Sequence, residues 1–425
     1  MNKDTAKTTP DGSLVKPGGR DSSLELLRIV AMLLVVASHL ACHAMGDGWK
    51  MWDLPFSVNQ AWSIALGRWG TFGVELFIIL SSYFMCGRKG IRSRKLFELA
   101  FQTVTTCVVF FFFIRLTGLN MVGKKALLEE VLELFTSQNY WFIPAYMVFY
   151  ALIPFMQMVS CRRGASFRLV VVYTLLVLVF RFYRPWWTPF FGSVGRFAYL
   201  YFITAWLKEA EGHADQDCPG AAEVPGAGLG GGCVRDQKRD SIAGTAGRGV
   251  RDRKPGHFIA RHAGLLSLAC FVLLVFEACF SRWRVTNGLG AFTLYVNDWL
   301  TLLFEFCLFY FFKNLHIGKS RFVNAAAGTV FGVYLLHENF LWMSWKDHER
   351  FSILWDQLLG AARWYESPFF PVYFVFASLL VFAVCAAVEF GLAFLRRQVM
   401  SRCGWLDALC ARIDGWYGAM FMAEA

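Results

Sequence analysis

The stretch LELLRIVAMLLVVASHLACH, residues 24–43, decides the fold. A transmembrane helix needs about twenty mainly apolar residues, and this stretch is long and apolar enough to cross a bilayer. It nevertheless carries Arg28 near one end and His39 and His43 near the other. Titratable groups are expensive in hydrocarbon, and those that occur there usually face a cavity or a polar partner. The stretch therefore predicts a membrane helix with one functional face.

The composition extends this reading to the whole chain. Of its 425 residues, 56% are hydrophobic and 17% aromatic, which is more apolar than most soluble domains. Further apolar runs approach the length of a membrane span, among them residues 101–116, 169–182, 265–280 and 369–387. Strands of a membrane barrel would alternate apolar and polar residues, and these runs do not. The predicted class is an all-α, polytopic integral membrane protein.

We expect about ten transmembrane helices. They lie at residues 24–45, 61–85, 96–118, 140–159, 169–183, 194–207, 262–280, 293–312, 323–343 and 368–394. Clusters of lysine and arginine follow the second, fourth, eighth and tenth spans. Because cytoplasmic loops are rich in these residues, the clusters place both termini in the cytoplasm. The expected localisation is the cell membrane, in multi-pass form.

The net charge of +11 has a simple explanation in this setting. Positive loops on the cytoplasmic side of a membrane protein account for it, so the lipid bilayer is an expected partner and nucleic acid is not. The 12 cysteines are scattered without a CxxC pair, which argues against a zinc ribbon or a disulfide framework. The spacing HLACH allows a metal site at His39, Cys42 and His43, but the sequence offers no further ligand set, and no metal is expected.

The chain divides into a membrane domain with polar flanks. Residues 1–20 are polar and are expected to be a disordered cytoplasmic segment, followed by a transmembrane domain at 21–395. Within it, residues 208–261 are rich in glycine, proline and charge and predict a disordered cytoplasmic loop. In the tail at 396–425, apolar residues recur at helical spacing, which predicts an amphipathic cytoplasmic helix on the membrane surface.

Three titratable residues form the candidate catalytic group. His39, Glu75 and His337 lie within a few residues of the same depth when spans are counted from their cytoplasmic ends. Two imidazoles and a carboxylate at one depth indicate proton-transfer chemistry in a cavity between helices. Arg28 shares a helix face with His39, about 16 Å closer to the cytoplasm.

Each of these residues also has a structural interpretation. Arg28 can be an interfacial charge that extends its head group to water, and His39 can be a hydrogen-bonded packing residue. Glu75 can serve as the ion-pair partner of an arginine, and His337 can lie at the membrane interface.

Four motifs resemble the membrane acyltransferase 3 family. Arg28 and His39 in the form R-x10-H resemble its first-helix motif, and GTFGVELFIILSSYF at 70–84 resembles its second-helix stretch. YWFIPAYMVFYALIP at 140–154 and GVYLLH at 332–337 resemble two later segments. The motifs occur in the family's order between about residues 21 and 395. Ser82 stands where the family commonly has glycine, and the long polar loop resembles an insertion.

The resemblance implies an O-acyltransferase. Its members move an acyl group to sugars and other extracytoplasmic acceptors, so we expect acetyl-CoA as the donor and a hydroxyl of a surface carbohydrate as the acceptor. No tightly bound cofactor is expected. His39 would act as the base or carry the acyl group, with Glu75 or His337 to orient it.

The remaining site residues are assigned to the two substrates. On the cytoplasmic side, Arg28, Arg92 and Lys95 are expected to bind the phosphates of CoA. Toward the acceptor, Arg196, Tyr334 and Trp141 offer the cationic and aromatic surfaces that suit sugars and charged glycans.

Two other functions stay open. A proton-coupled transporter or flippase for a polar solute or glycan would use the same buried histidines and glutamate as a proton relay, although the sequence shows no internal repeat of the kind many transporters have. A non-catalytic subunit of a polysaccharide assembly complex would not need His39 at all.

Overall fold

The chain is a helical bundle with one small hairpin. The computed structural model describes residues 21–45, 51, 54–87, 92–121, 127–129, 131–132, 140–162, 164–183, 193–211, 255–290, 297–346 and 349–422. The expected disordered segment at 1–20 and most of the expected loop at 208–261 lie outside these residues.

The helices follow the apolar runs of the sequence. Their bounds are α1 Ser22–His43, α3 Val58–Gly67, α4 Gly70–Met85, α5 Ser93–Thr117, α7 Phe142–Ser160, α8 Ala165–Tyr183, α9 Ser193–Ala210, α10 Pro255–Thr286, α11 Asn297–Lys313, α12 Arg321–Ala327, α13 Val330–His337, α14 Ala361–Tyr365, α15 Phe370–Met400 and α16 Gly404–Met422. After α13 come a 3-10 turn at Phe340–Trp342, strands β1 Met343–Lys346 and β2 Glu349–Ser352, and a π-helical turn at Ile353–Leu358.

Six helical segments of the described chain are long and apolar enough to span a bilayer. They are Ser22–His43, Val58–Met85, Ser93–Thr117, Phe142–Ser160, Arg261–Thr286 and Phe370–Met400. The expectation of a helical multi-pass membrane protein is therefore supported. A count of ten is not established, because α8, α9 and α11 contain no equally long and apolar window among the described residues.

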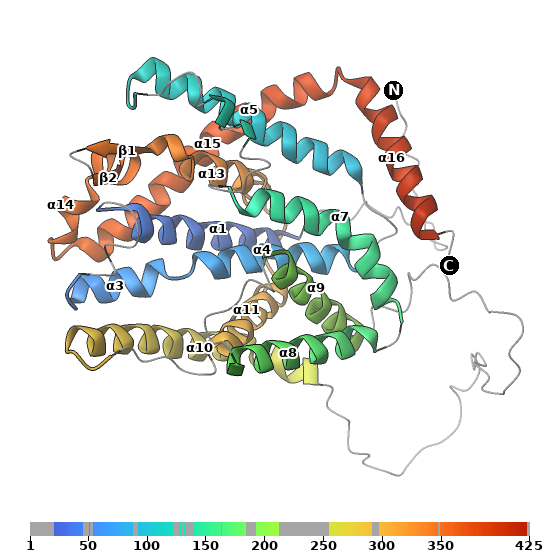
Figure 1. Ribbon diagram of the computed structural model, residues 1–425, viewed down its shortest axis with the longest axis horizontal. Coiled ribbons are helices and arrows are strands. Elements are labelled where there is room, and N and C mark those ends of the chain that lie inside the picture. Colours follow the sequence, from blue (N-terminus) through green and yellow to red (C-terminus); the bar gives the residue numbers. More distant parts are fainter. Residues whose placement is uncertain are drawn as a thin grey trace, which may run out of the picture.

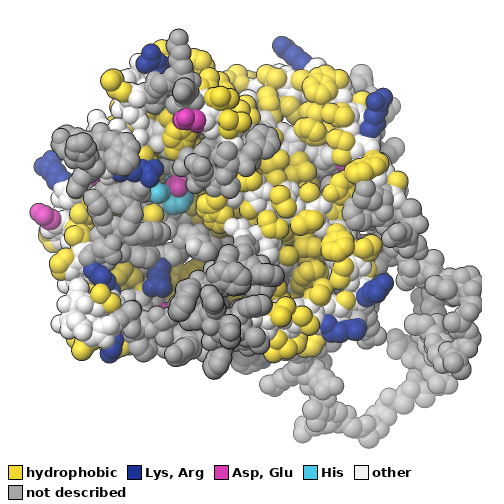
Figure 2. All heavy atoms as spheres, in the orientation of Figure 1, with side chains coloured by type: hydrophobic (Ala, Val, Ile, Leu, Met, Phe, Trp, Pro, Cys, Tyr) yellow, Lys and Arg dark blue, Asp and Glu magenta, His cyan; other side chains and the backbone are white. Residues whose placement is uncertain are grey.

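The bundle has two distinct ends (Figure 1). We call the end that carries β1, β2 and α14 the hairpin end, and the opposite end, which carries α16, the tail end. Helix α1 packs most closely on α4 near the middle of the bundle. Figure 2 shows a broad hydrophobic face across the molecule, with lysine and arginine side chains toward its margins, as the bilayer requires.

Glycines set the register between α1 and α4. An added Cβ at Gly70 would lie 2.6 Å from the side chain of Ser38, and one at Gly73 would lie 2.4 Å from the carbonyl oxygen of Ala31. Small residues allow membrane helices to approach this closely. This pairing makes the two helices antiparallel. Glu75, five residues beyond Gly70, therefore lies about 8 Å closer to the tail end than Ser38 does.

The expected ninth span at 323–343 is not one helix. Helix α12 ends at Ala327, Gly328 and Thr329 interrupt the run, and α13 covers only Val330–His337. Asn339 then turns the chain, because its side chain accepts a hydrogen bond from the backbone N–H of Leu341 at 2.9 Å. The prediction of a continuous span was wrong here, and the break leaves the end of α13 inside the bundle, next to α1.

The predicted tail helix is present as α16. It packs on the start of α5, where Ser93 N–H donates to Asp414 Oδ1 at 2.8 Å, and on α7, where the Tyr417 hydroxyl donates to the Ala151 carbonyl at 3.0 Å. Leu406 and Cys410 are buried, while other apolar side chains of the helix are exposed.

Candidate active site

Two histidines predicted from the sequence meet at the hairpin end. His39, on the last turns of α1, has its Nδ1 2.9 Å from Nε2 of His337, the last residue of α13. The ring of His337 is held by its other nitrogen, since Nδ1 lies 2.6 Å from the Val333 carbonyl one turn earlier and donates to it. A neutral His337 then presents Nε2 as an acceptor toward His39.

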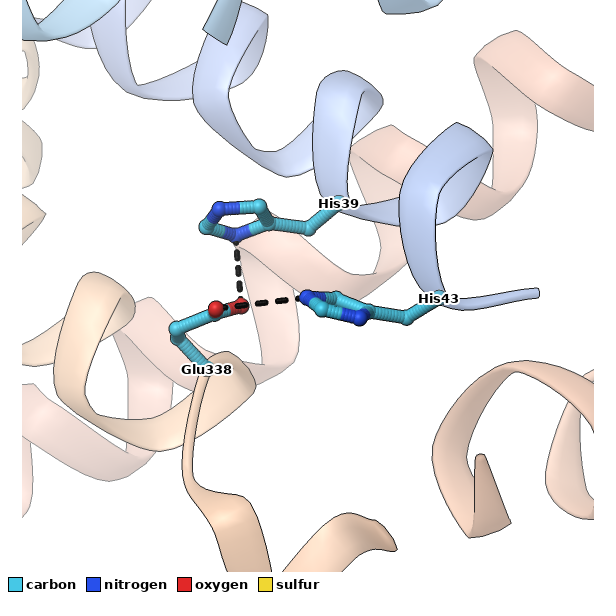
Figure 3. Close-up of side chains that lie close together, drawn as sticks. All are labelled: His39, His43 and Glu338. Atoms are coloured by element: carbon cyan, nitrogen blue, oxygen red, sulfur yellow. Dashed lines mark hydrogen bonds and ion pairs between the residues drawn. The ribbon is translucent and has the colours of Figure 1, made fainter. Parts of the chain in front are cut away.

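A carboxylate that the sequence reading did not single out completes the group. Glu338 caps α13, and its Oε2 lies 2.8 Å from His39 Nδ1 while its Oε1 lies 3.3 Å from His43 Nε2 (Figure 3). Two imidazoles from one helix face thus converge on one carboxylate from another element. We call His39, His43, His337 and Glu338 the histidine cluster. Its carboxylate is only 16% exposed, so these contacts are sheltered from water.

The cluster borders a small cavity of about 40 Å³. Its walls come from the end of α13, the turn that follows, and the hairpin, and the lining residues are His43, His337, Glu338, Asn339, Phe340, Trp342, Met343, Arg350, Ser352 and Trp355. In Figure 2, histidine and acidic side chains reach the surface side by side near this end of the molecule. The side chains of His39 and His43 are 19% and 23% exposed, so the cluster is within reach of a substrate that arrives from outside the bundle.

Glu75 lies elsewhere and has its own partner. Arg196 of α9 holds it through three hydrogen bonds, the shortest being 2.7 Å from Nη2 to Oε2. Glu305 of α11 is fully buried near this pair. No contact between Glu75 and the histidine cluster occurs among the described residues, because the packing of Gly70 and Gly73 on α1 puts Glu75 closer to the tail end.

The residues expected to bind CoA lie toward the tail end. Arg28 is joined to Glu25 one turn earlier, with Nη1 2.8 Å from Oε1, and its guanidinium lies 5.7 Å from the ring centre of Phe84. Arg92 precedes α5 and is exposed, and its backbone N–H donates to the Tyr150 hydroxyl at 3.3 Å. Lys95 lies on the first turn of α5 and is exposed.

The aromatic residues expected at the acceptor side are divided. Tyr334 is buried one turn before His337, with 6.4 Å between the two ring centres, so it lies near the histidine cluster. Trp141 caps the start of α7, is 40% exposed, and has its ring 6.2 Å from that of Phe142. Arg196 belongs with Glu75 rather than with either of them.

The cluster also has the donor set of a metal site. His39, His43 and Glu338 each offer one ligand atom, and these atoms lie within 4.8 Å of one another. Two imidazoles and a carboxylate suit zinc and related ions. The third ligand that the sequence spacing offered, Cys42, is not in this group. The same three side chains also contact one another directly, at ion-pair distances of 2.8 Å and 3.3 Å.

The comparisons with known proteins agree with the motifs. The sequence model of the acyltransferase 3 family, described as an acyltransferase domain, matches residues 21–390, which include α1 through most of α15. No curated protein and no solved structure matches the chain.

Proposed function

The chain belongs to the acyltransferase 3 family, and on that premise we propose that it moves an acetyl group from acetyl-CoA to a hydroxyl of an extracytoplasmic carbohydrate, such as a surface polysaccharide. It is a multi-pass membrane acyltransferase. The contact between His39 and Glu338 carries the proposal, because it supplies the base that attack by a sugar hydroxyl requires.

The proposed reaction follows from the direction of the His39 ring. Its Nδ1 faces His337 and Glu338, so its Nε2 is the nitrogen available to a substrate. Nε2 takes the hydroxyl proton while the oxygen attacks the thioester carbon. The carbon–sulfur bond then breaks, and the CoA thiolate leaves and takes from the His39 imidazolium the proton that Nε2 had accepted. The carboxylate of Glu338 holds the ring in one tautomer and stabilises the imidazolium.

The two ends of the bundle suit the two substrates. Basic residues near α5 at the tail end favour a cytoplasmic position for that end. In that orientation the histidine cluster lies toward the extracytoplasmic side. Arg28, Arg92 and Lys95 are then on the side where CoA is present. A second cavity, of about 330 Å³, opens at the tail end between α10 and α11, and Arg261, His262 and Phe311 are among its lining residues. It offers further room for part of the donor.

The pair of Glu75 and Arg196 is the observation that favours the transport alternative. Buried charges inside a membrane bundle often mark an ion pathway. Here the bidentate geometry accounts for them as a structural pair, and the histidine cluster, with its open cavity, lies at a different level. We therefore place the chemistry at the cluster.

The test is acyl transfer by the purified protein in lipid vesicles. Acetyl-CoA is supplied with an envelope glycan fraction, released CoA thiol is measured, and the glycan is examined by mass spectrometry for an added acetyl group. The proposal predicts that thiol release depends on the glycan. It also predicts an acetyl group on the glycan that base treatment removes. Glycan uptake into vesicles without thiol release would instead establish transport.

A further inference from the structure

The groove between α10 and α11 at the tail end has a cation on its wall. Its volume is about 330 Å³, and Arg261, Gly264, Leu265 and Phe311 are among its lining residues. The side chain of Arg261 is exposed, and it makes no ion pair or hydrogen bond with the described part of the chain. None of the described residues that line the groove is acidic. The groove therefore offers an unneutralised positive charge to an anionic ligand.

The groove lies at the edge of a membrane span. The apolar segment of α10 begins at Arg261 and runs to Thr286. The end of α11 beside the groove lies level with the start of α1, because the hydroxyl of Ser23 donates a hydrogen bond to the carbonyl of Leu315. In the proposed orientation this level is the cytoplasmic surface of the bilayer, where anionic phospholipids create a negative surface potential.

An exposed apolar stripe continues from the groove along α10. Leu265 is 70% exposed, and Leu268, Val272 and Phe276 follow it at helical spacing on the same face, each more than half exposed. At 1.5 Å per residue the stripe is about 16 Å long. Helix α10 lies at the outer edge of the bundle (Figure 1), so these exposed side chains face the hydrocarbon. A ligand of the groove thus meets a charge at one end and an apolar surface along its length.

We propose that the groove between α10 and α11 binds an anionic phospholipid, with its phosphate at Arg261 and an acyl chain along the stripe from Leu265 to Phe276. A volume of about 330 Å³ is within the usual range for ligand pockets, so the groove accepts a head group and the start of a chain as it stands. Basic pockets between membrane helices on the cytoplasmic side commonly bind such head groups. CoA is polar along most of its length and would leave the stripe without a partner. The inference concerns a second ligand and does not depend on acyl transfer.

The test compares phosphatidylglycerol with phosphatidylcholine of the same acyl chains. Each lipid is titrated into the full chain in detergent, and native mass spectrometry gives its affinity. We expect phosphatidylglycerol to bind more tightly, and Arg261→Gln to weaken its binding about fivefold, the usual contribution of one basic residue near an anionic lipid surface. Arg261→Lys keeps the charge and should stay within about twofold of the wild type. Arg321→Gln is the control, since Arg321 is exposed at the same end of the bundle and does not line the groove.

A photoreactive phosphatidylglycerol shows where the lipid lies. Cross-links to residues 261–276 and to Phe311, together with weaker binding by Arg261→Gln, would support the inference. Equal affinities of the wild type for the two lipids would overturn it, as would equal effects of Arg261→Gln and Arg321→Gln. Competition between acetyl-CoA and the lipid, with a raised KM for acetyl-CoA in Arg261→Gln, would also overturn it, because the occupant of the groove would then be the acyl donor.

Discussion

Glu338→Gln removes the charge of the carboxylate and keeps its shape. In the structure this carboxylate lies 2.8 Å from His39 Nδ1, so the centres of charge of imidazolium and carboxylate are about 4 Å apart. At an effective dielectric constant of about 20, such a pair is worth about 4 kcal/mol. The amide still accepts a hydrogen bond, which returns about 1 kcal/mol. The remaining loss of about 3 kcal/mol predicts a fall in kcat on the order of 100-fold.

The assay is thiol release from acetyl-CoA at saturating glycan, with folding checked by thermal denaturation in detergent. Glu366→Gln is the matched control, because Glu366 is exposed near the same end of the bundle and is expected to leave kcat unchanged. If folded Glu338→Gln retains more than a third of the wild-type kcat, the carboxylate does not stabilise a charged His39, and the proposed mechanism is wrong.

Three further outcomes follow from the packing and from the cluster. Arg196→Met leaves Glu75 buried without its cation and should lower stability by about 3–5 kcal/mol, measured by denaturation, with partial recovery in the double variant with Glu75→Met; no recovery would show that the loss does not come from the unpaired carboxylate of Glu75. Gly73→Ala should destabilise the contact of α1 with α4 by about 1–3 kcal/mol, whereas Gly391→Ala, which meets no atom within 4 Å, should not; equal melting temperatures would contradict this register. A chelator should leave the rate unchanged because the cluster side chains contact one another directly, and activity lost to the chelator and restored by zinc would show that the site needs a metal.

The sequence predicted the helical membrane class and the meeting of His39 with His337. Both results rest on strong local signals, namely long apolar runs and polar residues inside them. Counting residues inward from the cytoplasmic ends of the spans worked for His39 and His337, because each residue lies near the end of its helix at the hairpin end of the bundle. It failed for Glu75, since the register of α4 on α1 depends on which glycines meet which turns, and counting residues from a span end does not contain that information.

Glu338 illustrates a different limit. It directly follows His337, and its charge was visible in the sequence. A continuous span at 323–343 would have placed the two side chains about 100° apart on one helix, with no reason for both to face His39. The chain instead leaves the helix at this point, and the turn at Asn339 lets both side chains reach α1. A break in a helix of this kind depends on tertiary contacts that a periodicity argument does not include.

The measurement that tests the central claim most directly is thiol release by His39→Ala. We compare wild type, His39→Ala and the control His316→Ala in vesicles with acetyl-CoA and the glycan fraction. His316 is exposed, and its neighbours Leu315 and Ile317 bond to Ser23 at the start of α1, far from His39 at the end of that helix. Loss of a general base lowers rates by about 100- to 10,000-fold. We predict a loss in that range for His39→Ala and none for His316→Ala. Equal glycan-dependent release by folded wild type and His39→Ala would contradict the claim that acyl transfer occurs at the histidine cluster.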